Sequence, residues 1–344
     1  MFFVATTTEQ SHTNHAERAP KSPHDVPAAL LERLQTQRTA QHGQQKGMIS
    51  VNVRMKLGLL GLLPLWYCLQ SQAQPSLIEQ YTKGNDVLAA QIAELPDEQI
   101  LAEERRLAPQ ATDMLRSLKP LIREGADGLS IQDHLLAQFK AKGWQPMLVG
   151  YSGYPAAIAV SVNDGVLNGF PSDKPFPKAA LVTIELVSAS PRAHVAQAWT
   201  FATPDASEEQ KALLEAAHKA LRSGIEQVGD GAYIEDIGAA MQRVLDDYRV
   251  QPIAEYCGYA MGQKRIQPPC IIGYRNNYPT HTKMKKGQVL NIYAMANNGN
   301  ERRTRLNTAN FLEVFTVDGR DSVVLSAMVE VTADGYRMLS GFVE

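Results

Sequence analysis

The sequence predicts an α+β fold for the segment from about residue 98 to the C-terminus. Segments with the 3.6-residue apolar period of amphipathic helices stand between short runs with the composition of β-strands. From Gln251 onward the pattern is mainly one of short strands. Two successive groups, each pairing helices with strands, are typical of an α+β domain.

The expected helices of the first group are placed by an apolar face and by a cap. Residues 98–123 have one apolar face and predict a long helix. Ser130 with Asp133 has the spacing of a capping box, which predicts a second helix that ends near Lys142.

The second group begins with two more helices. Ser207 with Gln210 predicts a capped helix to about Val228, and residues 233–248 predict another. We expect strands at 156–162, 181–187, 252–256, 270–274, 288–295, 311–316, 322–332 and 336–343.

The first 97 residues divide into three segments. Residues 1–47 are polar and rich in Gln, His and Thr, which predicts disorder or a start codon assigned too early. Residues 48–73 have the features of a signal peptide, and residues 74–97 are expected to form a linker or N-terminal arm. Met48 and Met55 are alternative start positions.

The export signal has three parts in the usual order. Arg54 and Lys56 supply positive charge, residues 57–69 are mostly apolar, and Ser71 to Ala73 place small residues before Gln74. The apolar run of thirteen residues is shorter than the roughly 20 that a membrane-spanning helix needs. We therefore expect a periplasmic or secreted protein with no stable membrane span after cleavage. The alternative is a cytoplasmic protein with a hydrophobic helix docked on its core.

Composition limits the kinds of site. The net charge of −2 gives no overall field that would attract nucleic acid, so no nucleic-acid partner is expected. The three cysteines, Cys68, Cys257 and Cys270, form no CxxC pair. The eight histidines contain no HExxH motif.

Six short segments, in order across about 240 residues, resemble the type I methionine aminopeptidases. They are Gly150–Pro155, Ser161–Asn163 followed by Asn168–Pro171, Ile237–Gln242, Glu255–Gly258, Lys286–Gly287 and Val331–Gly335. The resemblance implies a pita-bread domain over residues 98–344, with two pseudo-symmetric α/β halves around a curved antiparallel sheet. It also implies that Tyr151, Tyr154 and Cys257 border a substrate-binding pocket.

The resemblance implies five metal-binding positions, which in the family hold two Asp, one His and two Glu around two divalent ions. Here these positions hold Glu185, Ala196, Tyr259, Tyr293 and Ser326. Two further histidines of the family pocket correspond to Asn168 and Ile266. One carboxylate cannot offset the desolvation of two cations, so we expect no metal and no other cofactor.

Two interpretations of this altered centre remain open. In the first, Glu185 acts as a base and a tyrosine as an acid, with Ser326, Asn168 and His194 as further pocket candidates. In the second, Tyr259 and Tyr293 fill the space of the metals and satisfy Glu185 by hydrogen bonds. The second predicts a non-catalytic peptide- or protein-binding relative; the first predicts a metal-independent hydrolase or other enzyme.

Cys257 and Cys270 would be the only cysteines left after signal cleavage. In an oxidising compartment they form either a disulfide or two buried thiols. A disulfide requires their Cα atoms to lie within about 7 Å.

Overall fold

The computed structural model describes residues 75–343. The polar segment 1–47 and the export signal 48–73 lie outside these residues, so both interpretations stay predictions. Residues 75–343 belong to one compact unit that runs to the C-terminus.

Five α-helices are described in this part of the chain. They are α2 (Leu77–Ala93), α3 (Asp97–Arg116), α4 (Gly128–Lys142), α5 (Glu208–Ile225) and α6 (Ile234–Tyr248), with 3-10 turns at Lys119–Leu121 and Tyr151–Gly153. The predicted capping box of α5 is confirmed, because the Ser207 and Gln210 side chains each accept the other's backbone N–H. The predicted start of α4 at Ser130 is wrong: Asp127 is the N-cap and accepts the Ser130 N–H at 2.8 Å.

The strands of the described residues are mostly short. They are β1 (Gln145–Pro146), β2 (Ala159–Val162), β3 (Gly165–Leu167), β4 (Leu181–Ser190), β5 (Ala193–Ala202), β6 (Gln251–Pro252), β7 (Gly258–Met261), β8 (Gln267–Ile271), β9 (Val289–Asn297), β10 (Thr304–Leu306), β11 (Val314–Thr316), β12 (Ser322–Thr332) and β13 (Gly335–Met338). The strand expected at 252–256 is wrong, because β6 ends at Pro252 and β7 begins only at Gly258. Strand β13 ends well before residue 343.

The strands form three sheets within residues 75–343, and every strand pair in them is antiparallel. One has the order β1-β4-β2 with β5 also on β4, and another has the order β13-β12-β9-β7-β8 with β6 also on β9. Strands β10-β11-β3 form the third sheet. Contacts between β5 and β12 join the first two sheets.

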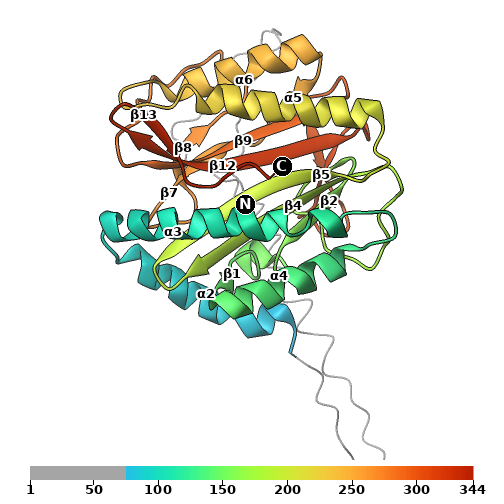
Figure 1. Cartoon of the computed structure of the whole chain (residues 1–344), viewed down its shortest axis with the longest axis horizontal. Coiled ribbons are helices and arrows are strands. Elements are labelled where there is room, and N and C mark those ends of the chain that lie inside the picture. Colours follow the sequence, from blue (N-terminus) through green and yellow to red (C-terminus); the bar gives the residue numbers. More distant parts are fainter. Residues whose placement is uncertain (1–74, 344) are drawn as a thin grey trace, which may run out of the picture. The chain divides into compact units, whose positions relative to one another are not determined.

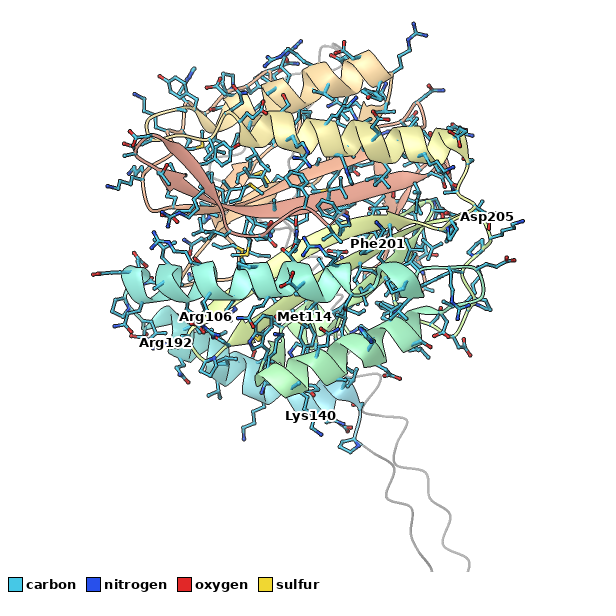
Figure 2. The ribbon with its side chains drawn as sticks, in the orientation of Figure 1. Arg106, Met114, Lys140, Arg192, Phe201 and Asp205 are labelled. Atoms are coloured by element: carbon cyan, nitrogen blue, oxygen red, sulfur yellow. A yellow bond between two sulfur atoms is a disulfide. The ribbon has the colours of Figure 1, made fainter. Side chains whose placement is uncertain are left out.

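Each of the two larger sheets is covered by a pair of helices, so the domain consists of two α/β halves (Figure 1). Helix α3 packs on β4 and β5, and α4 contacts β1. Helix α5 packs on β9 and β12, and α6 contacts β6 and β8. Met114 on α3 is buried in this core, whereas Arg106 on the same helix is exposed (Figure 2). The predicted α+β fold is thus confirmed.

The segment expected to be a linker contains helix α2. A capping box of Ser76 with Glu79 starts this helix, and the buried Asn85 side chain fixes it to the domain. Asn85 Nδ2 donates to the Pro146 carbonyl at 2.8 Å and to the Val149 carbonyl at 3.2 Å. No helix in residues 75–343 is long and apolar enough to cross a membrane.

Candidate functional site

Two tyrosines from neighbouring strands meet where the resemblance places the metal ions. Tyr259 on β7 and Tyr293 on β9 are each 2% exposed, and their hydroxyl oxygens are 3.3 Å apart. The ring centroids are 5.7 Å apart, so the rings fill the space between the strands as well as bonding at their ends. Burial raises the pKa of both phenols, which keeps them protonated.

Glu185 on β4 lies near this pair but does not bond to it. Its Oε1 accepts the Asn168 backbone N–H at 2.8 Å, and its Oε2 has no hydrogen-bond partner. The expectation that Tyr259 and Tyr293 donate hydrogen bonds to Glu185 is therefore wrong. The carboxylate still raises the pKa of Tyr259 and Tyr293 through its charge, although burial is the larger cause. Burial also raises the pKa of Glu185 to about 7.

Asn168 reaches Glu185 because of its backbone conformation. Its φ of +56° lies in the left-handed region, which asparagine adopts more readily than most residues. Its side-chain Nδ2 points elsewhere and donates to the Leu312 carbonyl at 3.1 Å. Asn168 thus contacts Glu185 through its backbone N–H and not through its side chain.

Hydrogen bonds at Ser326 and Ala196 join the two larger sheets. Ser326 on β12 lies opposite Tyr293 in the β9–β12 register, and its Oγ accepts the Ala198 N–H at 2.9 Å. Asn291 on β9 donates to the Ala196 carbonyl and to the Tyr259 hydroxyl, each at 3.3 Å. At positions that the resemblance assigns to metal ligands, polar groups thus form hydrogen bonds within the protein.

The residues at this centre do not fit a pair of divalent ions. The five implied positions offer one carboxylate, and one of its oxygens already accepts a hydrogen bond. The remaining oxygens are protonated phenols and a serine hydroxyl, whereas hard cations need several deprotonated ligands. Among residues 75–343, no group of three His, Cys, Asp or Glu side chains is arranged to hold a metal ion.

The other predicted pocket residues differ in whether they line a cavity. Tyr154 is buried, and its hydroxyl donates to the Gly169 carbonyl at 2.8 Å. His194 on β5 is also buried, and together with Tyr151 it lines a cavity of about 390 Å³. Neither Tyr154 nor Cys257 lines that cavity.

The cavity contains a residue that no sequence motif singled out. Arg265, in the turn between β7 and β8, places its guanidinium carbon 3.8 Å from the centre of the Tyr151 ring. Its Nη1 donates to the Met147 carbonyl at 2.8 Å. Burial lowers the pKa of His194 to about 4, and the positive charge of Arg265 contributes to this shift.

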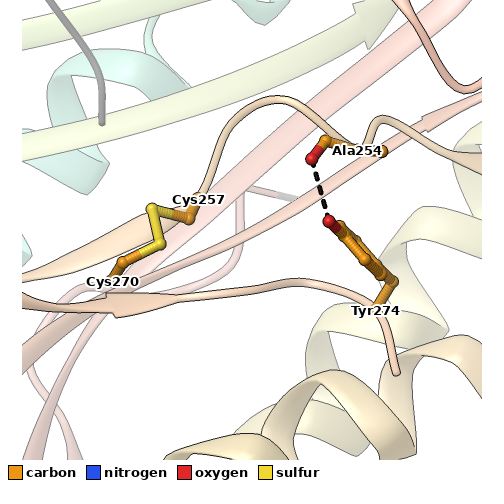
Figure 3. The surroundings of a disulfide bond; sticks show 4 residues. All are labelled: Ala254, Cys257, Cys270 and Tyr274. Atoms are coloured by element: carbon orange, nitrogen blue, oxygen red, sulfur yellow. Dashed lines mark hydrogen bonds between the residues drawn. A yellow bond between two sulfur atoms is a disulfide. The ribbon is translucent and has the colours of Figure 1, made fainter. Parts of the chain in front are cut away.

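A disulfide joins Cys257 to Cys270, with 5.7 Å between the Cα atoms (Figure 3). Of the two alternatives, a disulfide or two buried thiols, the structure contains the disulfide. Cys270 on β8 lies opposite Tyr259 on β7, so the bridge holds together the strand pair that carries this tyrosine. Nearby, the Tyr274 hydroxyl donates to the Ala254 carbonyl at 2.9 Å, as Figure 3 also shows.

Curated relatives match the sequence of this chain over most of their length. The chain is 28% identical over 226 residues to methionine aminopeptidase 1 of Bacillus subtilis (strain 168), which covers 65% of this chain and 89% of that relative. It is 28% identical over 195 residues to the methionine aminopeptidase of Rickettsia prowazekii (strain Madrid E), covering 57% of this chain and 74% of that relative.

Solved structures agree on the fold. The crystal structure of methionine aminopeptidase from Rickettsia prowazekii has a TM-score of 0.68 at 24% identity, covering 72% of this chain and 99% of that one. Prolidase from Pyrococcus furiosus has a TM-score of 0.55 at 17% identity, covering 75% of this chain and 68% of that one. Residues 103–333 match the model of metallopeptidase family M24. The chain therefore belongs to metallopeptidase family M24 and has the pita-bread fold of its methionine aminopeptidases.

Proposed function

We propose that this protein is a non-catalytic member of family M24 that binds a peptide or a segment of another protein. The contact between Tyr259 and Tyr293 is the observation that carries this proposal. Two buried rings occupy two of the five implied ligand positions, and burial keeps both phenols protonated. A cavity bordered by Tyr151 and His194 offers a place for a ligand.

Peptide hydrolysis tests this proposal. The purified protein is incubated with cobalt, manganese or iron and a Met-Ala-Ser peptide, and released methionine is measured. The expected result is no release above a buffer blank, with methionine aminopeptidase 1 of Bacillus subtilis as the positive control. Metal-dependent release by this protein would contradict the proposal.

A metal-independent enzyme is the second candidate, and the pKa of Glu185 favours it. A carboxyl group with a pKa of about 7 can take up and release a proton near neutral pH. Against this, Glu185 is 2% exposed and does not line the cavity. Turnover of any peptide without metal, abolished by Glu185→Gln in a variant that remains folded, would favour this second candidate.

We also propose that the protein is exported, with a mature chain that begins near Gln74. The charged and apolar sequence of residues 54–73 motivates this proposal. The disulfide between Cys257 and Cys270 supports it, because such bonds persist mainly in oxidising compartments. Mass spectrometry of the N-terminus in native cells tests it: an intact peptide across Ala73 and Gln74 in most molecules would contradict export.

A further inference from the structure

The cavity beside Tyr151 contains polar groups that the domain itself leaves unsatisfied. We call it the Arg265 cavity; its polar and charged lining residues include Asn85, Asp86, Tyr151, His194, Lys264 and Arg265. Asn85 is 5% exposed and His194 is 1% exposed, yet Asn85 Oδ1 and His194 Nδ1 have no hydrogen-bond partner. Buried polar atoms are normally paired, so these two atoms favour a site that a polar ligand completes.

Arg265 supplies the positive charge of the Arg265 cavity. One of its five N–H groups donates to the Met147 carbonyl, and its guanidinium lies over the Tyr151 ring. Within residues 75–343 no carboxylate forms an ion pair with it. The aromatic ring and the carbonyl hold the guanidinium in place, which leaves its other N–H groups available to an acceptor.

The remaining charges define the kind of acceptor. Lys264 adds a second cation to the lining, and Asp86 on α2 adds one anion. His194 is uncharged near neutral pH because burial lowers its pKa to about 4, and a neutral imidazole keeps one N–H donor. An excess of one positive charge fits a ligand that carries a single carboxylate better than one with several negative charges.

We propose that the Arg265 cavity binds the carboxylate at the C-terminus of a peptide, with Arg265 as its main partner. Arginine binds carboxylates through paired N–H donors. Asn85 Oδ1, whose amide is fixed by two main-chain carbonyls, accepts an N–H of the same peptide. At about 390 Å³ the Arg265 cavity is of the size that holds small ligands, roughly 300–1,000 Å³.

This inference rests on the proposed function and specifies which part of a peptide the protein recognises. Helix α2 contributes to it directly, because Asn85 and Asp86 both come from that helix. The guanidinium of Arg265 and the side-chain oxygen of Asn85 recognise the peptide, and no metal ion takes part.

Calorimetric titration with three probes tests the inference. The probes are N-acetyl-dialanine, its C-terminal carboxamide, and propionate, all at one ionic strength. We expect N-acetyl-dialanine to bind and the carboxamide to bind at least about tenfold more weakly, since a hydrogen bond between charged groups is lost. Weaker binding of propionate is expected, because it lacks the peptide N–H that Asn85 accepts.

Two variants and one control locate the binding. Arg265→Gln is expected to weaken binding of N-acetyl-dialanine by at least about tenfold. Arg305→Gln is the matched control: Arg305 also lies over an aromatic ring, that of Phe315 at 4.9 Å, but does not line the Arg265 cavity. If Arg265→Gln fails to fold, Ala89→Trp fills the cavity from α2 and should abolish binding with Arg265 intact.

Each outcome decides the inference. Equal binding of the acid and the carboxamide, or unchanged binding by Arg265→Gln, would overturn it and leave a peptide-binding function standing. Propionate binding as tightly as N-acetyl-dialanine would keep carboxylate recognition but assign the ligand to free organic acids. No binding of any probe would overturn the inference, whereas methionine release in the peptide assay would overturn the proposed function instead.

Discussion

At the scale of single residues, two tyrosines and one carboxylate are buried at the centre of this domain. Tyr259 and Tyr293 bring ring volume and one mutual hydrogen bond, and both can be buried at little electrostatic cost because they are neutral. Glu185 is different, because its burial favours the protonated form of the carboxyl group, although the Asn168 N–H and the charge of Arg265 oppose this shift. The tyrosines therefore stabilise the centre, and Glu185 makes its stability depend on pH.

Truncation of Tyr293 is expected to destabilise the protein strongly. Tyr293→Ala would leave a cavity between β9 and its neighbours, at a cost of about 3–5 kcal/mol in the free energy of unfolding. Tyr293→Phe should cost far less, because it keeps the ring and the carboxylate of Glu185 does not depend on this hydroxyl. Chemical denaturation measures both, with Tyr278→Ala at a side chain that is 73% exposed as the control. Equal small effects of both Tyr293 variants would show that the ring does not fill the centre.

The free energy of unfolding should depend on pH through Glu185. Its pKa is raised from 4.5 to about 7 in the folded protein, so the folded state binds the proton more tightly than the unfolded state. The stabilisation from this proton is complete below pH 4.5 and is lost as the pH rises through about 7. Glu185→Gln keeps an oxygen for the Asn168 N–H and cannot ionise, so it should gain roughly 3 kcal/mol relative to the wild type across this range.

Thermal or chemical denaturation of both proteins at several pH values measures this difference. Glu104 has a pKa raised to about 8 by burial and by the charges of Asp97 and Glu330, so it adds a pH dependence of the same sign to both proteins. Glu98→Gln, at an exposed position of α3, is the matched control. A constant difference between Glu185→Gln and the wild type from acid to neutral pH would show that Glu185 ionises normally.

Sequence comparison alone could identify the substituted ligand positions, but not the hydrogen bonds made there. Tyr259, Tyr293 and Glu185 were located by their positions relative to the matching segments. The bond from the Asn168 N–H to Glu185 depends on a left-handed backbone conformation that residue type alone does not specify. Arg265 was missed because its role comes from contacts with Tyr151 and Met147, which are distant in sequence.

At the scale of elements, the strongly amphipathic helices were predictable and α2 was not. Only Asn85 and Ile92 are buried in α2, so the helix has no continuous apolar face, and a polar side chain provides much of its attachment. The start of α4 was misplaced because Asp127 and Ser130 both have side chains suited to an N-cap. The tertiary structure selects Asp127, which forms a β-bridge with Pro175.

The pairing of β7 with β8 is expected to depend on the disulfide. The bridge joins residues 13 apart in sequence, and closing a loop of this size contributes about 3 kcal/mol by restricting the unfolded chain. Replacement of both Cys257 and Cys270 by Ala should therefore lower the melting temperature and weaken ligand binding in the Arg265 cavity, since Arg265 lies within that loop.

Thiol quantitation in unreduced, denatured mature protein accompanies this measurement. No free thiol is expected, because Cys257 and Cys270 are bridged. Two free thiols, or a double variant as stable as the wild type, would show that the bridge does not support this part of the domain.

At the scale of the whole molecule, different residues determine the fold and the chemistry. The fold follows from segments matching family M24 across residues 103–333, and the two sheets with their covering helices follow that pattern. The chemistry depends on a few side chains, and the five positions that the resemblance assigns to metal ligands hold a single carboxylate, that of Glu185. The proposed function therefore combines the architecture of a peptidase family with a centre that lacks the groups for metal binding, since a fold does not by itself fix a function.

The central claim is that the tyrosine-filled centre cannot hold metal ions, and the metal content of the purified protein tests it most directly. The protein is equilibrated with manganese or cobalt, dialysed, and analysed by mass spectrometry for bound metal. A matched variant restores the implied ligands, with Glu185→Asp, Ala196→Asp, Tyr259→His, Tyr293→Glu and Ser326→Glu. The account predicts substoichiometric metal in the wild type and a higher content in any folded restored variant. Stoichiometric metal in the wild type, lost on Glu185→Gln, would contradict it.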